Sequence, residues 1–252
     1  MKQNIPVLLA ILFLTSCNSK TEEKKPQLIP KDEKVPDILK PKETEVVQLK
    51  KDIADFIPAG YVLYKEEGME DIKGDLNGDS LEDVVFLIKG TDKTKFFDHE
   101  YRGKLDRNRR GIIILYNRGD GYELATKNYN CFSSENEEGG VYYAPELWLA
   151  VEKGNLKINY AHGRYGSWSY TFRHKNGDFE MIGYDSDYNR GPVPQTITSI
   201  NLLTKKKLTR DNLNKDDDGE NYVENFKDTW ETIKVDRLLK LSEIKDFDEL
   251  EF

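Results

Sequence analysis

The 252-residue sequence contains little cysteine or histidine. With only Cys17 and Cys131, a fold held together by several disulfides is excluded, and we expect Cys131 to be a small buried apolar residue. The three histidines, at positions 99, 162 and 174, are not spaced as metal ligands.

Recognised catalytic signatures are also missing. The sequence has no G-x-S-x-G, no H-E-x-x-H and no glycine-rich phosphate loop. Aspartate and glutamate are plentiful, so two carboxylates could still meet in space as they do in glycosidases. The sequence therefore leaves the catalytic residues unknown.

No apolar run is long enough to span a bilayer, which takes about 20 residues. The net charge is -8, which argues against nucleic acid as a partner. Hydrophobic residues make up only 37% of the chain, but 14 Tyr and 11 Phe predict a core built on aromatic side chains.

The amino terminus carries the first informative segment of the sequence. Lys2 precedes an apolar run over residues 5–14, about 10 residues, which is the length of a signal peptide. The run ends in Leu14-Thr15-Ser16-Cys17, which resembles the lipobox of bacterial lipoproteins. An ordinary secretory signal that happens to end in cysteine is the alternative.

The resemblance implies that residues 1–16 are removed and that Cys17 is acylated and anchored in the lipid bilayer. Two or more acyl chains would hold the protein stably on a membrane. Asn18 stands where an aspartate would resemble the inner-membrane retention signal, which favours the outer membrane. Lys20 to Lys25 loosely resemble the charged export tracts of some Bacteroidetes lipoproteins; a solvated tether is the alternative.

Residues 17–50 are predicted to form a disordered, lipidated tether. From residue 18 on they contain four prolines among alternating Lys and Glu and no aromatic residue, so they cannot bury enough apolar surface to fold. The globular domain is predicted to occupy residues 51–252.

The globular part carries mainly strand signals. Apolar or alternating segments predict strands at 83–88, 111–116, 122–125, 147–151, 156–160, 168–172, 179–184 and 199–203. Asn176-Gly177 predicts a tight hairpin turn, because a type I′ turn needs positive φ at both central positions. Residues 147–184 thus predict an antiparallel four-stranded meander.

We therefore predict a mainly β fold of antiparallel meander sheets, sandwich-like or like part of a propeller. Apolar spacings of three and four in 223–245 predict a C-terminal helix, with a strand at 232–235 as the alternative. Residues 91–110 and 209–221 are predicted to be loops.

One motif carries recognisable chemistry. Oxygen side chains occur at positions 1, 3, 5 and 9 of a loop, at Asp75, Asn77, Asp79 and Asp83, and the Leu81 carbonyl would add a further oxygen. Calcium takes six to eight such ligands. A metal-free turn rich in Asp and Asn that leads into a strand is the alternative.

This loop resembles the calcium hairpins of FG-GAP and VCBS-type repeats, over residues 74–88. The resemblance implies a structural Ca²⁺ held by residues 75–83. Two features depart from the family: Ser80 replaces the usual glycine at position 6, and only one copy is present. An EF-hand is excluded because Phe86 stands at position 12, where glutamate is required.

Two further segments are candidate sites. The acidic run 212–220 has oxygen side chains at alternate positions, but a solvated loop is the preferred interpretation. The segment 162–168 carries four side chains that could bind a sugar or a peptide: His162, Arg164, Tyr165 and Trp168. An ordinary glycine-containing turn is the alternative.

The sequence thus predicts an envelope lipoprotein with a calcium-stabilised β domain, and favours a non-enzymatic binding or structural module over an enzyme. A carboxylate-dependent hydrolase of envelope glycan or peptide is one alternative. An inhibitor or assembly factor for another envelope protein is the other. The possible partners are therefore an envelope protein or a glycan.

Overall fold

The computed structural model describes residues 49–65, 71–137, 144–216 and 222–252. All of these belong to one compact unit, Val46–Phe252. The predicted signal peptide, Cys17 and most of the tether lie outside the described residues.

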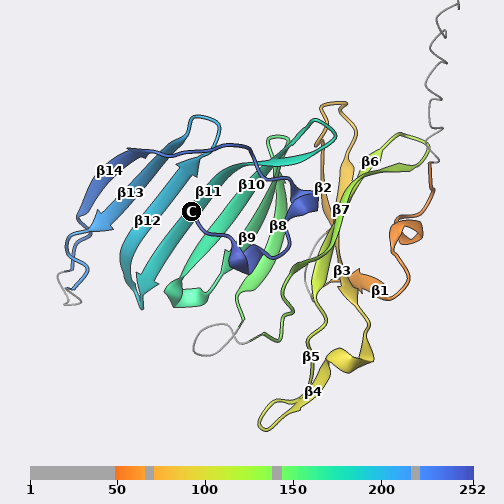
Figure 1. Ribbon diagram of the computed structural model, residues 1–252, viewed down its shortest axis with the longest axis horizontal. Helices are drawn as coiled ribbons and strands as arrows, with labels where there is room; N and C mark the ends of the chain where they lie inside the picture. The colour runs from red at the N-terminus through yellow and green to blue at the C-terminus, as the bar shows by residue number, and fades with distance from the viewer. Residues whose placement is uncertain (1–48, 66–70, 138–143, 217–221) are drawn as a thin grey trace, which may run out of the picture. The chain divides into compact units, whose positions relative to one another are not determined.

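The regular structure of the described chain is mainly antiparallel β, arranged in two sheets and a separate hairpin (Figure 1). The five-stranded sheet consists of β1 (Tyr61–Tyr64), β2 (Ile72–Gly74), β3 (Asp83–Gly90), β6 (Arg110–Asn117) and β7 (Tyr122–Phe132). Its order is β1-β3-β6-β7, and β2 pairs with β3 beyond the end of β1. The mainly β prediction is confirmed.

The second sheet is a seven-stranded meander in which every strand pairs with its neighbours in sequence. It consists of β8 (Glu146–Glu152), β9 (Asn155–Ala161), β10 (Gly166–Lys175), β11 (Asp178–Arg190), β12 (Val193–Asn201), β13 (Lys206–Asn212) and β14 (Phe226–Thr232). The predicted four-strand meander is confirmed as its first half. Asn176 and Gly177 have φ of 54° and 75°, as the predicted turn requires.

The two sheets share one hydrophobic core, as in a sandwich. Alternate residues of β3 and β6, including Leu87 and Ile114, pack in one cluster with alternate residues of β9 and β10, including Ile158 and Phe172. The sheets meet where β2 approaches β8: a Cβ at Gly74 would lie 2.5 Å from Val151 Cγ1, so this contact requires glycine.

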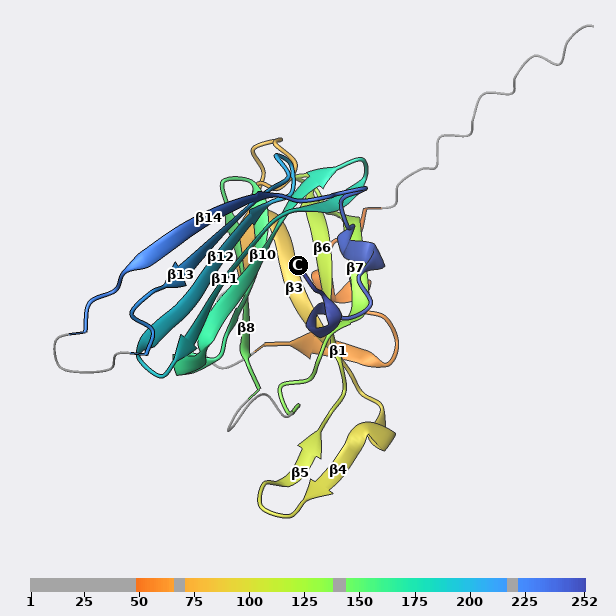
Figure 2. The same ribbon diagram turned by 60° about the vertical axis from the view of Figure 1, so that its left-hand side comes forward.

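The C-terminal segment fills the space between the sheets. Its turns η4 (Leu241–Glu243) and η5 (Phe247–Glu249) lie beside β7, and η4 also contacts β11 (Figure 2). Leu241, Ile244 and Phe247 are buried in the common core. The predicted C-terminal helix is wrong: residues 223–245 form strand β14 and a single 3₁₀ turn, and β14 ends where the alternative strand would begin.

Two predicted loops contain regular structure. Residues 91–110 include the 3₁₀ turn η2 (Lys93–Lys95) and a hairpin of β4 (Phe96–His99) and β5 (Gly103–Asp106). In the second loop, residues 209–212 belong to β13, which is anchored by its pairing with β12 and β14. Two more 3₁₀ turns, η1 (Ile53–Phe56) and η3 (Gly163–Tyr165), complete the described elements.

Candidate functional site

The predicted calcium loop connects β2 to β3, and Gly74 pairs with Asp83 at its base. The Asp75 carboxylate lies at the centre of the loop and accepts backbone N–H donors from Gly78 at 2.7 Å, Asp79 at 3.2 Å and Ser80 at 2.9 Å. These donors, Ser80 above all, hold the pKa of Asp75 below its usual value. The ionised Asp75 carboxylate therefore stabilises the turn through these hydrogen bonds.

Asp83 is fully buried at the other end of the loop. Its two oxygens accept the backbone N–H of Leu76 at 2.9 Å and that of Asn117 at 3.0 Å. Burial raises the pKa of Asp83, while these two donors lower it. Asp83 thus fastens the loop to the end of β6.

Asp79 carries the most exposed carboxylate of the motif, and a cation already contacts it. Arg118 Nη1 lies 3.2 Å from Asp79 Oδ2, while Arg118 Nε donates to Glu123 at 2.7 Å. Asn77 accepts from the backbone N–H of Asp79 at 2.9 Å and donates to its Oδ2. Negative charge in the loop is therefore compensated by an arginine in this structure.

The arrangement fits a metal only in part. Across the described ranges, no three His, Cys, Asp or Glu side chains come together in a group that could hold a metal ion. Asp75, Asn77 and Asp79 lie on one short turn, but both Asp83 oxygens face backbone donors. Ser80 has a φ of 70°, so position 6 adopts the left-handed conformation for which glycine is favoured. Calcium at this loop stays a prediction.

The second acidic run lies partly outside the described residues, since 217–221 are not included. Of the part described, Asn212 is buried and donates to the Pro194 carbonyl at 2.7 Å, while Asn214 donates to the Val223 carbonyl at 2.8 Å. These two amides therefore stabilise the end of the β13–β14 hairpin.

An aromatic cavity of about 480 Å³ opens at the edge of the common core. It is lined by residues from five segments far apart in the sequence: Ser133, Glu137, Pro145, His162, Trp168, Tyr170, Tyr184, Phe247, Asp248 and Leu250. Four of these are aromatic rings, and two are carboxylates. The cavity thus combines flat apolar surfaces with hydrogen-bonding groups.

The rings of this aromatic cavity are fixed by neighbouring rings. Trp168 stacks on Tyr160 with centroids 5.2 Å apart and planes 12° apart. Tyr184 stacks on Phe252 at 4.4 Å and 16°. Because stacked rings restrain each other, Trp168 and Tyr184 present preformed surfaces to a ligand.

The four predicted ligand-binding residues divide between two adjoining cavities. His162 and Trp168 line the aromatic cavity, whereas Arg164 and Tyr165 line a smaller one of about 230 Å³, which His162 also reaches. The sequence did not predict Tyr184, Phe247 and Asp248 as candidate ligand-binding residues, because only folding brings β11 and η5 to the aromatic cavity.

Gly166 fixes the entry of the chain into β10. Its φ is 121°, and a Cβ there would lie 1.9 Å from the Asp187 carbonyl oxygen. Any side chain would push β10 away from β11 where β10 begins, at the Gly166–Tyr188 pair. This glycine is therefore required by the close approach of two backbones.

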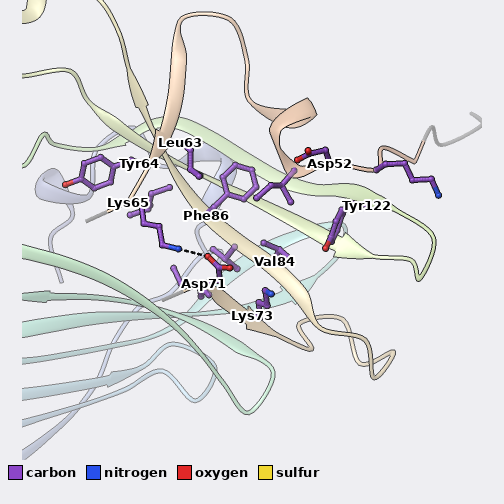
Figure 3. A pocket seen from close by; sticks show the side chains of 14 residues that line it. Asp52, Leu63, Tyr64, Lys65, Asp71, Lys73, Val84, Phe86 and Tyr122 are labelled. Atoms are coloured by element: carbon purple, nitrogen blue, oxygen red, sulfur yellow. Dashed lines mark hydrogen bonds and ion pairs between the residues drawn. The ribbon is translucent and has the colours of Figure 1, made fainter. Parts of the chain in front are cut away.

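A separate slot-shaped cavity of about 300 Å³ lies at the edge of the five-stranded sheet (Figure 3). β1 ends opposite Leu87 and β2 begins opposite Val85, so the edge is interrupted beside Phe86. Lys65 and Asp71 form an ion pair of 2.8 Å across this interruption. The lining also includes Lys51, Asp52 and Lys73, so the slot combines an apolar floor with three lysines and two aspartates.

A larger cavity, of about 790 Å³, lies between the β4–β5 hairpin and the five-stranded sheet. Its arginines are engaged by protein groups. Arg109 forms an ion pair with Asp246 at 2.8 Å, and Arg107 lies over the Phe97 ring at 4.1 Å. This cavity is best explained as the contact surface of the hairpin.

The fold defines the class of the chain as an antiparallel two-sheet β domain with a preformed aromatic cavity. Comparison with protein-family models, curated proteins and solved structures gave no match. No helix in the described ranges is long and apolar enough to cross a membrane.

Proposed function

We propose that this protein is a lipid-anchored binding module of the bacterial envelope, with the outer membrane as its favoured location, and that its ligand is a glycan. Acylated Cys17 would hold the chain on the bilayer, and the tether would carry the β domain. The observation that supports ligand binding is the aromatic cavity, in which Trp168 and Tyr184 are fixed by stacking.

The chemistry of the lining favours a saccharide. Sugar rings have an apolar face that packs on an aromatic ring, and their hydroxyls need donors and acceptors at the rim. Glu137, Asp248, Ser133 and His162 supply such groups around the rings. Two carboxylates also disfavour an anionic ligand, so the proposed ligand is neutral.

In this proposal the β2–β3 loop binds a structural Ca²⁺. The oxygens at Asp75, Asn77, Asp79 and the Leu81 carbonyl are the hard ligands that calcium takes. Calcium would have to displace Arg118 from Asp79, since the two compete for the same oxygen. The bound Ca²⁺ would stabilise the folded domain and would not contact the ligand, because the loop is separate from the residues that line the aromatic cavity.

The binding proposal is tested by titrating the soluble domain, residues 46–252, with β-1,4-linked disaccharides of glucose, mannose and N-acetylglucosamine. We expect saturable binding of at least one sugar and a loss of at least tenfold in affinity in Trp168→Ala. Trp148→Ala is the matched control, because Trp148 is 42% exposed on β8 outside the cavity. No binding by the wild type, or equal binding by Trp168→Ala, would contradict the proposal.

One observation favours a second candidate function, hydrolysis of an envelope glycan: Glu137 and Asp248 line the same cavity as the rings. Two carboxylates beside a bound sugar are the minimum that glycoside hydrolysis requires. The test is release of reducing ends from a bound oligosaccharide. Hydrolysis by the wild type that is lost in both Glu137→Gln and Asp248→Asn would establish this function instead.

A further inference from the structure

A row of hydroxyl side chains leads away from the aromatic cavity across the seven-stranded sheet. In the antiparallel register, Trp168 lies opposite Ser186, which lies opposite Thr198. Thr198 lies opposite Thr209, which in turn lies opposite Thr229 on β14. One residue from each of five consecutive strands therefore forms a continuous line.

This hydroxyl row (Ser186, Thr198, Thr209 and Thr229) is on the face that holds the aromatic cavity. Directly opposed residues of an antiparallel sheet share a face, and so do residues two apart on one strand. Two positions along each strand, the next set of opposed residues includes Tyr170, Tyr184 and Ile200, which all pack in or against the common core. The row is thus a direct extension of the cavity lining.

The hydroxyls of the row have no hydrogen-bond partner among the described side chains. Within residues 144–216 and 222–252, none of the four forms a side-chain hydrogen bond with another described residue. Nearby hydroxyls differ: on the opposite face, Ser199 donates to Asp185 at 2.6 Å and Ser167 donates to Asp187, and beside the row Thr196 donates to Asp211 at 3.2 Å. The row therefore keeps its donors and acceptors for a ligand.

The charges beside the row cancel. On one side Lys207 lies opposite Glu231, and on the other Asp211 lies opposite Lys227. Each flanking line thus carries one cation and one anion on β13 and β14. Such a surface favours hydroxyl groups over an ionic ligand of either sign.

We infer that the ligand is a linear neutral polysaccharide that lies across the strands, with one or two sugar units in the aromatic cavity and the following units on the hydroxyl row. This inference rests on the proposed function and adds the length and direction of the ligand. Neighbouring strands are about 4.8 Å apart, so the line from β10 to β14 extends roughly 19 Å. That length accommodates several sugar units beyond the cavity.

A peptide strand would bind differently. Strand addition uses the backbone of an edge strand and runs parallel to it, whereas the hydroxyl row runs across five strands. The row also lacks the alternating apolar pockets that side chains of an extended peptide require. A polysaccharide, which carries hydroxyl groups on every sugar unit, matches the row instead.

The test measures affinity as a function of chain length, with β-1,4-linked glucose, mannose and N-acetylglucosamine oligosaccharides of two and six units. The variant is Thr198→Val with Thr209→Val, because valine keeps the shape and strand preference of threonine and removes only the hydroxyl. Thr171→Val is the matched control, since Thr171 is half-buried on the opposite face of β10. Urea unfolding of each variant checks that the fold is retained.

For the wild type and Thr171→Val we expect the hexasaccharide to bind about tenfold tighter than the disaccharide, as a few additional hydrogen bonds imply. In the double variant the hexasaccharide should lose that advantage, while the disaccharide affinity changes less than twofold. Equal affinities for the two lengths in the wild type would overturn the inference and leave the proposed function standing, as would an unchanged hexasaccharide affinity in the double variant. No binding of any member of the panel would overturn both.

Discussion

Asp178 on β11 accepts a hydrogen bond from the Thr126 hydroxyl on β7 at 3.0 Å, so a buried carboxylate connects the two sheets directly. The same carboxylate accepts the backbone N–H of Phe179 at 2.7 Å and the Ser242 hydroxyl of η4. Asp178 therefore joins both sheets and the C-terminal segment at one point.

Replacement of Asp178 by alanine should strongly destabilise the domain. The change leaves the Thr126 and Ser242 hydroxyls and the Phe179 N–H without their acceptor, and hydrogen bonds to charged groups contribute about 1.5–3 kcal/mol each. We expect the free energy of unfolding to fall by about 3 kcal/mol in urea titrations. Asp228→Ala is the control, because that ion pair with Arg210 is exposed and should cost less than about 1 kcal/mol. A loss for Asp178→Ala no larger than that of the control would show that the junction is dispensable.

Ser80→Gly should stabilise the β2–β3 loop. Ser80 has a φ of 70°, a conformation that costs a residue with a Cβ about 1–2 kcal/mol, partly offset by the greater entropy of glycine in the unfolded chain. We expect a gain of about 0.5–1 kcal/mol in thermal or urea unfolding. Gly78→Ala, at φ of 84° in the same loop, should shift stability in the opposite direction. Unchanged or lower stability of Ser80→Gly would mean that the loop is not strained at this position.

Calcium should raise the melting temperature of the soluble domain relative to chelator. At one hundred times its dissociation constant, a ligand that binds only the folded state adds about 2.7 kcal/mol. Asp75→Asn should abolish the shift. Arg118→Gln should lower the calcium concentration needed, because it removes the cation beside Asp79. Identical melting in calcium and in chelator would leave the loop as a hydrogen-bonded turn without a metal.

Cys17→Ser should release the protein from membranes. Stable anchoring depends on acyl chains, each buried methylene of which contributes about 0.8 kcal/mol. Fractionation of cells should move the variant from the outer-membrane pellet to the soluble fraction, whereas Cys131→Ser should stay in the pellet, because Cys131 is fully buried in the core. A Cys17→Ser variant that still sediments with membranes would show that another feature attaches the protein.

The strands that the sequence predicted are those with strong local signals. β3, β6 and the first meander strands carry apolar or alternating residues and end in glycine-containing turns, such as Lys153-Gly154 with φ of 51° and 72°. β13 and β14 were missed because both of their faces carry polar residues, so alternation of apolar and polar side chains gives little signal there.

The C-terminal error has a physical explanation. Leu238, Leu241, Ile244 and Phe247 follow one another at intervals of three, and all contact the common core. Spacings of three and four resemble an α-helix, but a strict interval of three is the period of 3₁₀ turns. The segment accordingly touches the core through two short turns instead of a helical face.

Part of the candidate site could be predicted and part could not. His162 and Trp168 are close in sequence and were predicted together as candidate ligand-binding residues, and both line the aromatic cavity. Tyr184 and Phe247 join them only because β11 pairs with β10 and the C-terminal segment folds back between the sheets. Contacts between such distant segments leave no local pattern in a single sequence.

The most direct test of ligand binding at the aromatic cavity is to map the amide signals that shift when the soluble domain binds a saturating neutral disaccharide. We expect shifts concentrated at residues 162–170, Tyr184 and 247–250, and their absence in Trp168→Ala. Shifts centred instead on the slot at Lys65 and Asp71, or no shifts in the wild type, would contradict this expectation.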